Sequence, residues 1–381
     1  MLVLLWIVLA SCLLAQAESP ASAAPLVTVR QQGPADFVGA DHATLAAALA
    51  NLGERGGGTL LVGPGRYVVR RSLFPPANVT IRGEAGSVLA LPSPGVLRVA
   101  AAAGTRELLL REAGEFATDG RIGIFPPAGV EFLPDGESIG LGPLALASVQ
   151  GERLELVEPL TLDVPAGSRV SYPVKLVFVN RAGGLTLENL TFAGGRIEDV
   201  PMPGHFVHCA IWASPPFGFG SEPAGPPARE VTIRHCRFTD WYGRAIAFYN
   251  VADSLVEGSL FERIADEAID LDHYCERVRV VGNLVRESIW GIVLNDASRC
   301  TVEYNFIEGC EVGIYGWWLE RVPPEGLNEE NRIQHNTVRA SRQASILLER
   351  GCHRNVIEHN FVDRAVRVVE STNTVRDNTL W

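Results

Sequence analysis

The stretch LTLENLTF (residues 185–192) decides the fold because its pattern recurs along the rest of the chain. Each copy has a branched apolar residue, two or three further positions, a small polar residue and then an apolar pair. The other copies are VTIRHCRF (231–238), SLVEGSLF (254–261), VRVVGNLV (278–285), TVEYNFIE (301–308), RIQHNTVR (332–339), NVIEHNFV (355–362) and a truncated VRDNTLW at the C-terminus. From residue 231 the period is mostly about 23 residues, and self-similarity at such a period indicates a solenoid.

The alternation within each copy determines the type of solenoid. Apolar residues recur with a period of two and are rich in Val, Ile and Phe, which predicts strands rather than helices. Short strands separated by turns leave no room for a crossover helix, so they can stack in parallel only if each copy is one turn of a coil. We therefore predict an all-β fold, a single-stranded parallel β-helix.

A short polar side chain occupies the same place in successive copies. These residues are Asn189, Cys236, Ser259, Asn283, Asn305, Asn336, Asn360 and Asn378. At a bend, such a side chain can hydrogen-bond the backbone of its own coil and of the next coil, so we expect a structural ladder without a chemical role. His235, His335 and His359 fall in the same turn, where a solvated stack is expected rather than a metal site.

Composition and charge limit the partners. The net charge of −11 argues against nucleic acid and anionic membranes. The apolar run Leu2–Leu14 is too short to span a bilayer, and Ala15-Gln16-Ala17 after it has the form of a signal-peptidase site. Residues 1–17 therefore predict a signal peptide and a secreted or periplasmic bacterial protein, with a lipoprotein anchor at Cys12 as the alternative. We expect a monomer.

Six cysteines follow the predicted signal peptide: Cys209, Cys236, Cys275, Cys300, Cys310 and Cys352. Their even number in an exported chain permits disulfides. The coil register leaves Cys275 with Cys300 as the pair that could bond, and buried thiols are the default expectation.

The segment before the repeats resembles a known family. Asp41–Leu52 reads as a helix, followed by GERGGGTLLVGPGRYVV (53–69) and NVTIRG (78–83). This order is similar to the N-terminal region of the pectate-lyase superfamily, which implies a right-handed β-helix closed by a capping helix. The superfamily includes lyases, hydrolases, epimerases and non-catalytic proteins, so the resemblance implies the fold and not one activity.

The remaining segments complete the predicted organisation. Residues 26–96 form the cap and first coils, 97–176 a small β insertion with a hairpin at VQGERLEL, and 177–381 the β-helix repeats. The chain has one lysine, Lys175, which this division leaves outside the repeats. The Pro- and Gly-rich stretch at 213–230 predicts either a lid beside a site or a disordered loop.

The strand AIDLDH (268–273) carries the residues with the clearest chemical potential. If Ile269 and Leu271 point into the coil, Asp270 and Asp272 point outward. Carboxylates beside flat aromatic rings are typical of sugar-binding grooves. Asp266 and Glu267 fringe this face, and we expect substrate contacts from Trp241, Tyr242, Tyr249, Tyr274, Asn295, Tyr315, Trp317, His208 and Glu349.

Several chemistries fit this pair. Alternate residues of a strand lie roughly 6.5 to 7 Å apart between α-carbons, near the lower end of the carboxyl separation of inverting glycosidases, so one aspartate could protonate the leaving oxygen while the other activates water. Alternatively, the two could bind Ca²⁺ or form a solvated face. In an elimination, His273 or Arg244 would remove the C5 proton of a uronate, with Ca²⁺ held by the aspartates.

Two further resemblances concern the same segment. DEAIDLDHY (266–274) is similar to the first acidic segment of polygalacturonases, but ESIWGIVLN (287–295) lacks the second pair of aspartates. It also resembles the Asp-Pro-His-Asp motif of mannuronan epimerases, which implies a proton-abstracting role for His273. We therefore predict an enzyme that cleaves or modifies a polysaccharide, with a non-catalytic carbohydrate-binding or cell-surface β-helix protein as the alternative.

Overall fold

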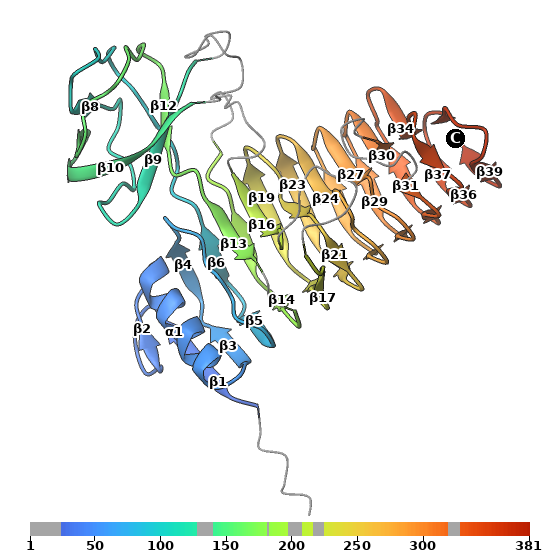
Figure 1. Cartoon of the computed structure of the whole chain (residues 1–381), viewed down its shortest axis with the longest axis horizontal. Coiled ribbons are helices and arrows are strands. Elements are labelled where there is room, and N and C mark those ends of the chain that lie inside the picture. Colours follow the sequence, from blue (N-terminus) through green and yellow to red (C-terminus); the bar gives the residue numbers. More distant parts are fainter. Residues whose placement is uncertain (1–23, 128–139, 181–182, 197–207, 216–224, 319–327) are drawn as a thin grey trace, which may run out of the picture.

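The computed structural model describes residues 24–127, 140–180, 183–196, 208–215, 225–318 and 328–381. They form a parallel β-helix with a helical cap at its N-terminal end and a small antiparallel sheet beside the first coils (Figure 1). The predicted all-β solenoid is confirmed. The predicted signal peptide and the Cys12 anchor lie outside the described residues.

Three long sheets make the walls of the coil. The twelve-stranded sheet contains, in order, β2 (Phe37–Val38), β1 (Leu26–Arg30), β3 (Gly58–Val62), β5 (Val79–Gly83), β14 (Thr186–Glu188), β18 (Thr232–Arg234), β22 (Leu255–Glu257), β25 (Arg279–Val281), β28 (Thr301–Glu303), β32 (Arg332–Gln334), β36 (Val356–Glu358) and β39 (Thr374–Arg376). The ten-stranded sheet contains β4 (Gly65–Val68), β6 (Ser87–Ala90), β15 (Thr191–Ala193), β19 (Arg237–Trp241), β23 (Leu260–Ile264), β26 (Leu284–Arg286), β29 (Phe306–Glu308), β33 (Thr337–Arg339), β37 (Phe361–Val362) and β40 (Thr379–Leu380).

The eight-stranded sheet is the third wall. It contains β13 (Lys175–Val179), β16 (Cys209–Ala213), β20 (Ile246–Phe248), β24 (Glu267–Leu271), β27 (Trp290–Asn295), β30 (Val312–Trp317), β34 (Ala344–Leu348) and β38 (Val366–Val368). Two strand pairs, β17 (Ala228–Arg229) with β21 (Val251–Ala252) and β31 (Asn328–Glu329) with β35 (Cys352–His353), lie at turns between walls. Because every wall pairs in parallel, equivalent side chains stack in columns.

The cap consists of α1 (His42–Glu54) packed over the first coil. Asp41 is its N-cap and accepts a hydrogen bond from the Thr44 backbone N–H at 3.0 Å. The apolar face of α1 consists of the buried residues Leu45, Ala48, Leu49 and Leu52. The helix thereby covers strand edges that would otherwise be open to pairing. The predicted helix at 41–52 is therefore confirmed.

The insertion is a six-stranded sheet in the order β7 (Gly95–Val96), β12 (Arg169–Ser171), β9 (Arg121–Phe125), β10 (Leu141–Gln150), β11 (Arg153–Leu156) and β8 (Glu107–Leu109). The predicted hairpin is present, with Gln150 opposite Arg153. Lys175, however, begins the first strand of the eight-stranded sheet and pairs with Cys209. The expectation that Lys175 lies outside the repeats is wrong, because the chain re-enters the coil immediately after the insertion.

The polar ladder is present with one correction. The Nδ2 groups of Asn283, Asn305, Asn336 and Asn360 each donate to the Oδ1 of the next asparagine at 2.8–3.0 Å. Asn189 does not belong to this ladder, since Glu188 pairs with Arg234 and Asn189 is therefore level with His235. Leu190 takes the ladder position in that coil. A second ladder, not foreseen, runs through Cys300, Asn331, Asn355 and Asn373 at another turn.

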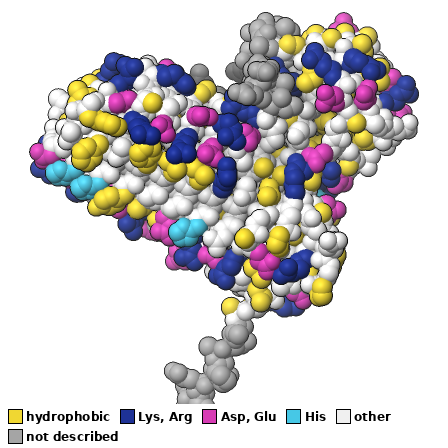
Figure 2. Space-filling view, turned by 180° about the vertical axis from the view of Figure 1, so that it is seen from behind, with side chains coloured by type: hydrophobic (Ala, Val, Ile, Leu, Met, Phe, Trp, Pro, Cys, Tyr) yellow, Lys and Arg dark blue, Asp and Glu magenta, His cyan; other side chains and the backbone are white. Residues whose placement is uncertain are grey.

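Two of the histidines of this turn, His335 and His359, stack on the surface. The His335 ring lies 5.2 Å from His359 and 5.1 Å from Tyr304, nearly parallel to both. Histidine side chains are visible on the outside of this part of the solenoid (Figure 2). The stacked arrangement agrees with the expectation of a solvated column.

The described cysteines are buried. Cys236, Cys275, Cys300, Cys310 and Cys352 are free thiols. Cys275 Sγ donates to the Phe248 carbonyl at 3.2 Å and Cys300 Sγ to the Ser298 carbonyl at 3.4 Å. The alternative of a Cys275–Cys300 disulfide is therefore wrong. Burial raises the pKa of Cys300 to about 12, which keeps this thiol protonated.

We expect Asn336→Ala to destabilise the fold more than Asn378→Ala. Asn336 is fully buried, and its Nδ2 donates to the carbonyls of Val302 and Gln334. Each buried partner left unpaired costs about 1–3 kcal/mol. Asn378 is partly exposed in the last coil, where water can replace the hydrogen bonds of its side chain. Urea unfolding of both variants measures the difference, and equal losses would contradict a buried ladder.

Candidate functional site

The outer face of the eight-stranded sheet carries the predicted aspartates. Ile269 and Leu271 lie in the hydrophobic core, and Asp270 is level with Ala247 on β20 and Val293 on β27. The same column continues through Tyr315, Leu347 and Arg367, as the alternation predicts. Ala247 belongs to a separate apolar cluster with Cys209, Trp212 and Tyr249, outside the core.

Arg244 holds four carboxyl groups together on this face. Its Nη1 lies 2.7 Å from Asp270 Oδ2 and 3.4 Å from Asp272 Oδ2, and its Nε lies 3.7 Å from Asp266 Oδ2. Nε also forms an ion pair with Glu267. Nη1 donates a hydrogen bond to the Tyr249 hydroxyl. We call Arg244, Asp266, Glu267, Asp270 and Asp272 the carboxyl cluster.

The cluster is almost entirely buried. Asp270 is 1% exposed and Asp272 3%, whereas the sequence predicted an open groove around them. One guanidinium cannot balance four carboxylates in this environment, so some of the acids hold their protons. Burial raises the pKa of Glu267 to about 8 and that of Asp270 well above its usual value, with Arg244 opposing both shifts.

Asp272 differs from its neighbours because donors surround it. Its Oδ1 accepts hydrogen bonds from the His273 backbone N–H at 2.8 Å and from Asn295 Nδ2 at 2.7 Å. It is therefore the acceptor of the cluster. The predicted contact residue Asn295 lies level with Trp317 on the next strand.

His273 is paired with an acid that sequence reasoning missed. Its Nδ1 lies 2.8 Å from Asp296 Oδ2, and both side chains are buried. Asp296 follows β27 with a φ of 52°, one coil beyond His273. Its only signal in the sequence is the polar end of GIVLND (291–296), which does not show that the side chain reaches back by one coil.

Aromatic rings continue along the same sheet. Trp290 stacks on Tyr315 at 4.6 Å between ring centroids, and Tyr315 lies 6.3 Å from Trp317. These three rings are half-buried, and Glu349 beside Tyr315 is exposed. On the N-terminal side, Tyr249 stacks on Trp212 at 4.7 Å, and the Lys175 ammonium lies 3.8 Å from the Trp212 ring.

Other predicted contact residues lie in different places. The prediction that Trp241 contacts the substrate is wrong. This residue is fully buried in the core and donates a hydrogen bond to the Phe192 carbonyl, because the positive φ of Asp240 (60°) interrupts the alternation. Tyr242 and His208 are buried next to each other, 6.2 Å apart between rings, beside the insertion. Tyr274 is half-buried, and its ring lies 6.4 Å from that of His273.

The Ca²⁺ alternative finds no support in the cluster. The position among the acids that a cation would occupy is taken by the Arg244 guanidinium. Within the described residues no group of three or more His, Cys, Asp or Glu side chains is arranged to hold a metal ion.

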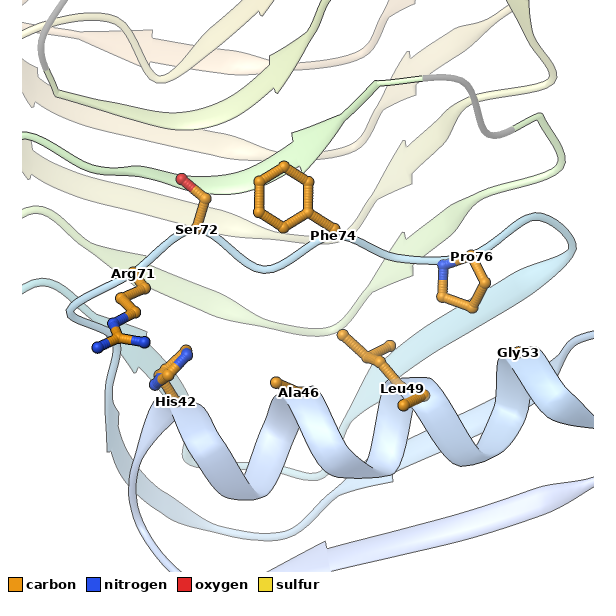
Figure 3. Close-up of a pocket in the computed structure, with 9 residues that line it drawn as sticks. His42, Ala46, Leu49, Gly53, Arg71, Ser72, Phe74 and Pro76 are labelled. Carbon is orange, nitrogen blue, oxygen red and sulfur yellow. The ribbon is translucent and has the colours of Figure 1, made fainter. Parts of the chain in front are cut away.

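A separate cavity of about 550 Å³ lies at the cap between α1 and residues 71–76 (Figure 3). His42 and Arg71 lie at one end, and Leu49, Phe74 and Pro76 give it an apolar wall. None of its lining residues belongs to the carboxyl cluster, so it is a distinct feature of the cap.

We expect Glu267→Gln to flatten the pH dependence of stability. Folding raises the pKa of Glu267 from its usual 4.5 to about 8, so the native state binds the extra proton between these values. The resulting contribution to the free energy of unfolding is fully present below pH 4.5. It is lost as pH rises to 8, at about 1.4 kcal/mol per pH unit.

Thermal unfolding between pH 6.5 and 8 measures this effect. This pH window avoids the titration of His208. Folding lowers its pKa to about 3, so its effect on the free energy of unfolding changes between pH 3 and 6.5. Glu257→Gln, at a half-exposed position on the twelve-stranded sheet, is the matched control. Parallel pH profiles of wild type and Glu267→Gln would contradict the raised pKa.

Comparison with known proteins identifies the family. The model of the right-handed β-helix region matches residues 176–321 and 229–380, which together cover more than half of the chain. The chain therefore belongs to the right-handed β-helix family. No curated protein sequence matches it. Among the residues that the structure describes, no helix has the length and apolar character needed to cross a membrane.

Solved structures with this architecture are distant in sequence. The complex of XylC with xylose is 10% identical over 90% of this chain and 66% of XylC, with a TM-score of 0.50. The pre-mature bacteriophage phi29 gene product 12 is 10% identical over 83% of this chain and 39% of that protein, with a TM-score of 0.51. A structure named glycoside hydrolase is 13% identical, with coverage of 93% and 96% and a TM-score of 0.49. The similarities to XylC and to gene product 12 show the fold alone.

Proposed function

We propose that this protein is an exported carbohydrate-active enzyme that hydrolyses a polysaccharide on the outer face of the eight-stranded sheet. The carboxyl cluster carries the proposal. A buried acid with a pKa of about 8, Glu267, lies against the same guanidinium as the acceptor Asp272. Perturbed acids of this kind concentrate at catalytic sites, because burying them otherwise only lowers stability.

The geometry favours Glu267 rather than Asp270 as the partner of Asp272. The facing oxygens of Asp270 and Asp272 lie 2.7 and 3.4 Å from one nitrogen of Arg244. A water could not fit between two acids so close together. Glu267 instead contacts Nε, on the other side of the guanidinium.

The proposed reaction is a direct displacement by water. Glu267 donates its proton to the leaving glycosidic oxygen as the bond to the anomeric carbon breaks. Asp272 accepts a proton from the water that attacks this carbon. Arg244 positions both acids, and the half-buried rings of Trp290, Tyr315 and Trp317 offer apolar faces to neighbouring sugar units.

Elimination is the second candidate because of the His273–Asp296 pair. A carboxylate that accepts from Nδ1–H holds the imidazole in the tautomer whose Nε2 can accept a proton. Such a base could remove the C5 proton of a uronate unit. A carbohydrate-binding protein without turnover would use the same rings.

Product analysis on a panel of polysaccharides separates these functions. New reducing ends without ultraviolet absorbance support hydrolysis. New reducing ends with the absorbance of an unsaturated uronate support elimination, and binding without either product contradicts an enzyme. Cell fractionation and light scattering test the expected export and monomeric state.

A further inference from the structure

A second polar cluster lies where the insertion meets the β-helix. Arg169 and Ser171 are alternate residues of β12, so their side chains share one face of the inserted sheet. Ser171 Oγ lies 2.9 Å from Nε2 of His208, the residue immediately before β16. The Tyr242 ring lies 6.2 Å from that of His208, so Ser171, His208 and Tyr242 form one buried group, with Arg169 on the same strand face as Ser171.

Arg169 has an unusual environment for an arginine. It is 3% exposed, and its Nη1 is buried with no hydrogen-bond partner among the residues that the structure describes. No ion pair of Arg169 occurs in the part of the chain that the structure describes. Burial lowers the pKa of this guanidinium, yet an arginine stays charged in proteins. A buried charge without a counter-ion costs several kcal/mol, so its position is a strong indication of an anionic ligand.

His208 adds a second buried polar atom without a partner in the described part of the chain. This residue is 3% exposed, its Nε2 faces Ser171, and its Nδ1 has no hydrogen-bond partner among the described residues. Burial lowers the pKa of His208 to about 3, so the ring is neutral at physiological pH. In the tautomer in which the Ser171 hydroxyl donates to Nε2, the Nδ1–H remains a hydrogen-bond donor.

We propose that Arg169, Ser171 and His208 form a binding site for the carboxylate of an acidic sugar. The cluster supplies one positive charge and a neutral donor, which match a monoanion better than a phosphate dianion. The planar fork of a guanidinium also fits a carboxylate in a bidentate manner. This inference rests on the proposed function and specifies its substrate as an acidic polysaccharide.

The position of the site relative to the carboxyl cluster supports this assignment. The Ala210 backbone N–H donates to the Arg244 carbonyl at 3.3 Å, and Ala210 follows His208 by two residues. Tyr242 precedes Arg244 by two residues. The pairing of β16 with β20 therefore places His208 one coil before Gly243, the neighbour of Arg244, so the two sites lie on the same wall of the β-helix.

Thermal shift with monosaccharides and the Arg169→Met variant tests the proposal. Glucuronate or galacturonate should raise the Tm of the wild-type protein, and glucose or galactose should not. Arg169→Met should be at least as stable as wild type without ligand, because a buried unpaired charge is removed, and it should lose the response to uronates. Arg263→Met, which removes a surface pair with Asp240, should keep that response.

Other results would overturn the site. An Arg169→Met variant that unfolds more easily yet keeps its uronate response would show a structural arginine. Inorganic phosphate or sulfate acting as strongly as uronates would show a general anion site. His208→Gln, which keeps an amide near Ser171, should weaken the response without abolishing the fold. These readouts need no turnover, so an Arg169-dependent response in a protein without activity would retain this inference and reject the proposed function.

Discussion

Hydrolysis of the polysaccharide should fall by about 10²- to 10⁴-fold in both Glu267→Gln and Asp272→Asn, the usual contribution of a positioned proton donor or acceptor. Glu267 is expected to protonate the leaving oxygen, and Asp272 to accept the proton of the attacking water. Neither substitution changes side-chain size, so kcat should fall with little effect on KM. Initial rates of reducing-end release measure the change.

The two variants should differ with activated substrates. An aryl glycoside with an acidic phenol as leaving group needs no protonation, so it should restore turnover by Glu267→Gln and not by Asp272→Asn. Asp253→Asn, an exposed turn residue paired with Arg229 and Arg277, is the control for the loss of a carboxylate elsewhere. Full activity of the double variant Glu267→Gln/Asp272→Asn would reject the site.

Arg244→Met should lower the free energy of unfolding by about 3–5 kcal/mol at pH 7.5, the usual effect of removing one partner from a buried ionic group. The substitution leaves Glu267, Asp270 and Asp272 buried without their positive charge. Because carboxyl groups are neutral when protonated, the loss should shrink towards pH 5. Urea unfolding at both pH values measures it.

A second variant keeps this prediction testable if Arg244→Met fails to fold. Arg244→Met/Glu267→Gln removes one of the stranded acids and should recover part of the lost stability. Arg169→Met is the matched comparison, since the same substitution removes a buried arginine that has no ion pair with any described residue. Equal losses from Arg169→Met and Arg244→Met would contradict the distinction between a paired and an unpaired guanidinium.

The fold was predictable because the repeats record it directly. Period-two alternation fixed the inward and outward residues of β24, and stacking in parallel extended that assignment to the other coils. The prediction was wrong where the backbone leaves the regular strand conformation. Asp240 adopts a positive φ and turns Trp241 into the core, and the residue pattern does not indicate this change in backbone conformation.

The site was predictable only as a set of neighbours on one face. Asp270, Asp272 and Arg244 do come together, but the number of charges around Arg244 and the depth of burial depend on packing between coils. Asp296 and Arg169 were missed for the same reason. Asp296 reaches His273 on the preceding coil, and Arg169 is buried where the insertion meets the β-helix; local patterns show neither.

The most direct test is infrared difference spectroscopy of the carboxyl groups between pH 6 and 10. A protonated acid has a C=O stretching band that disappears on ionisation. We expect such a band at neutral pH in wild type, its weakening as pH rises through about 8, and a weaker band at neutral pH in Glu267→Gln. A neutral-pH spectrum without a protonated carboxyl, or one unchanged in Glu267→Gln, would mean that Glu267 is ionised and cannot donate the proton on which the proposed reaction depends.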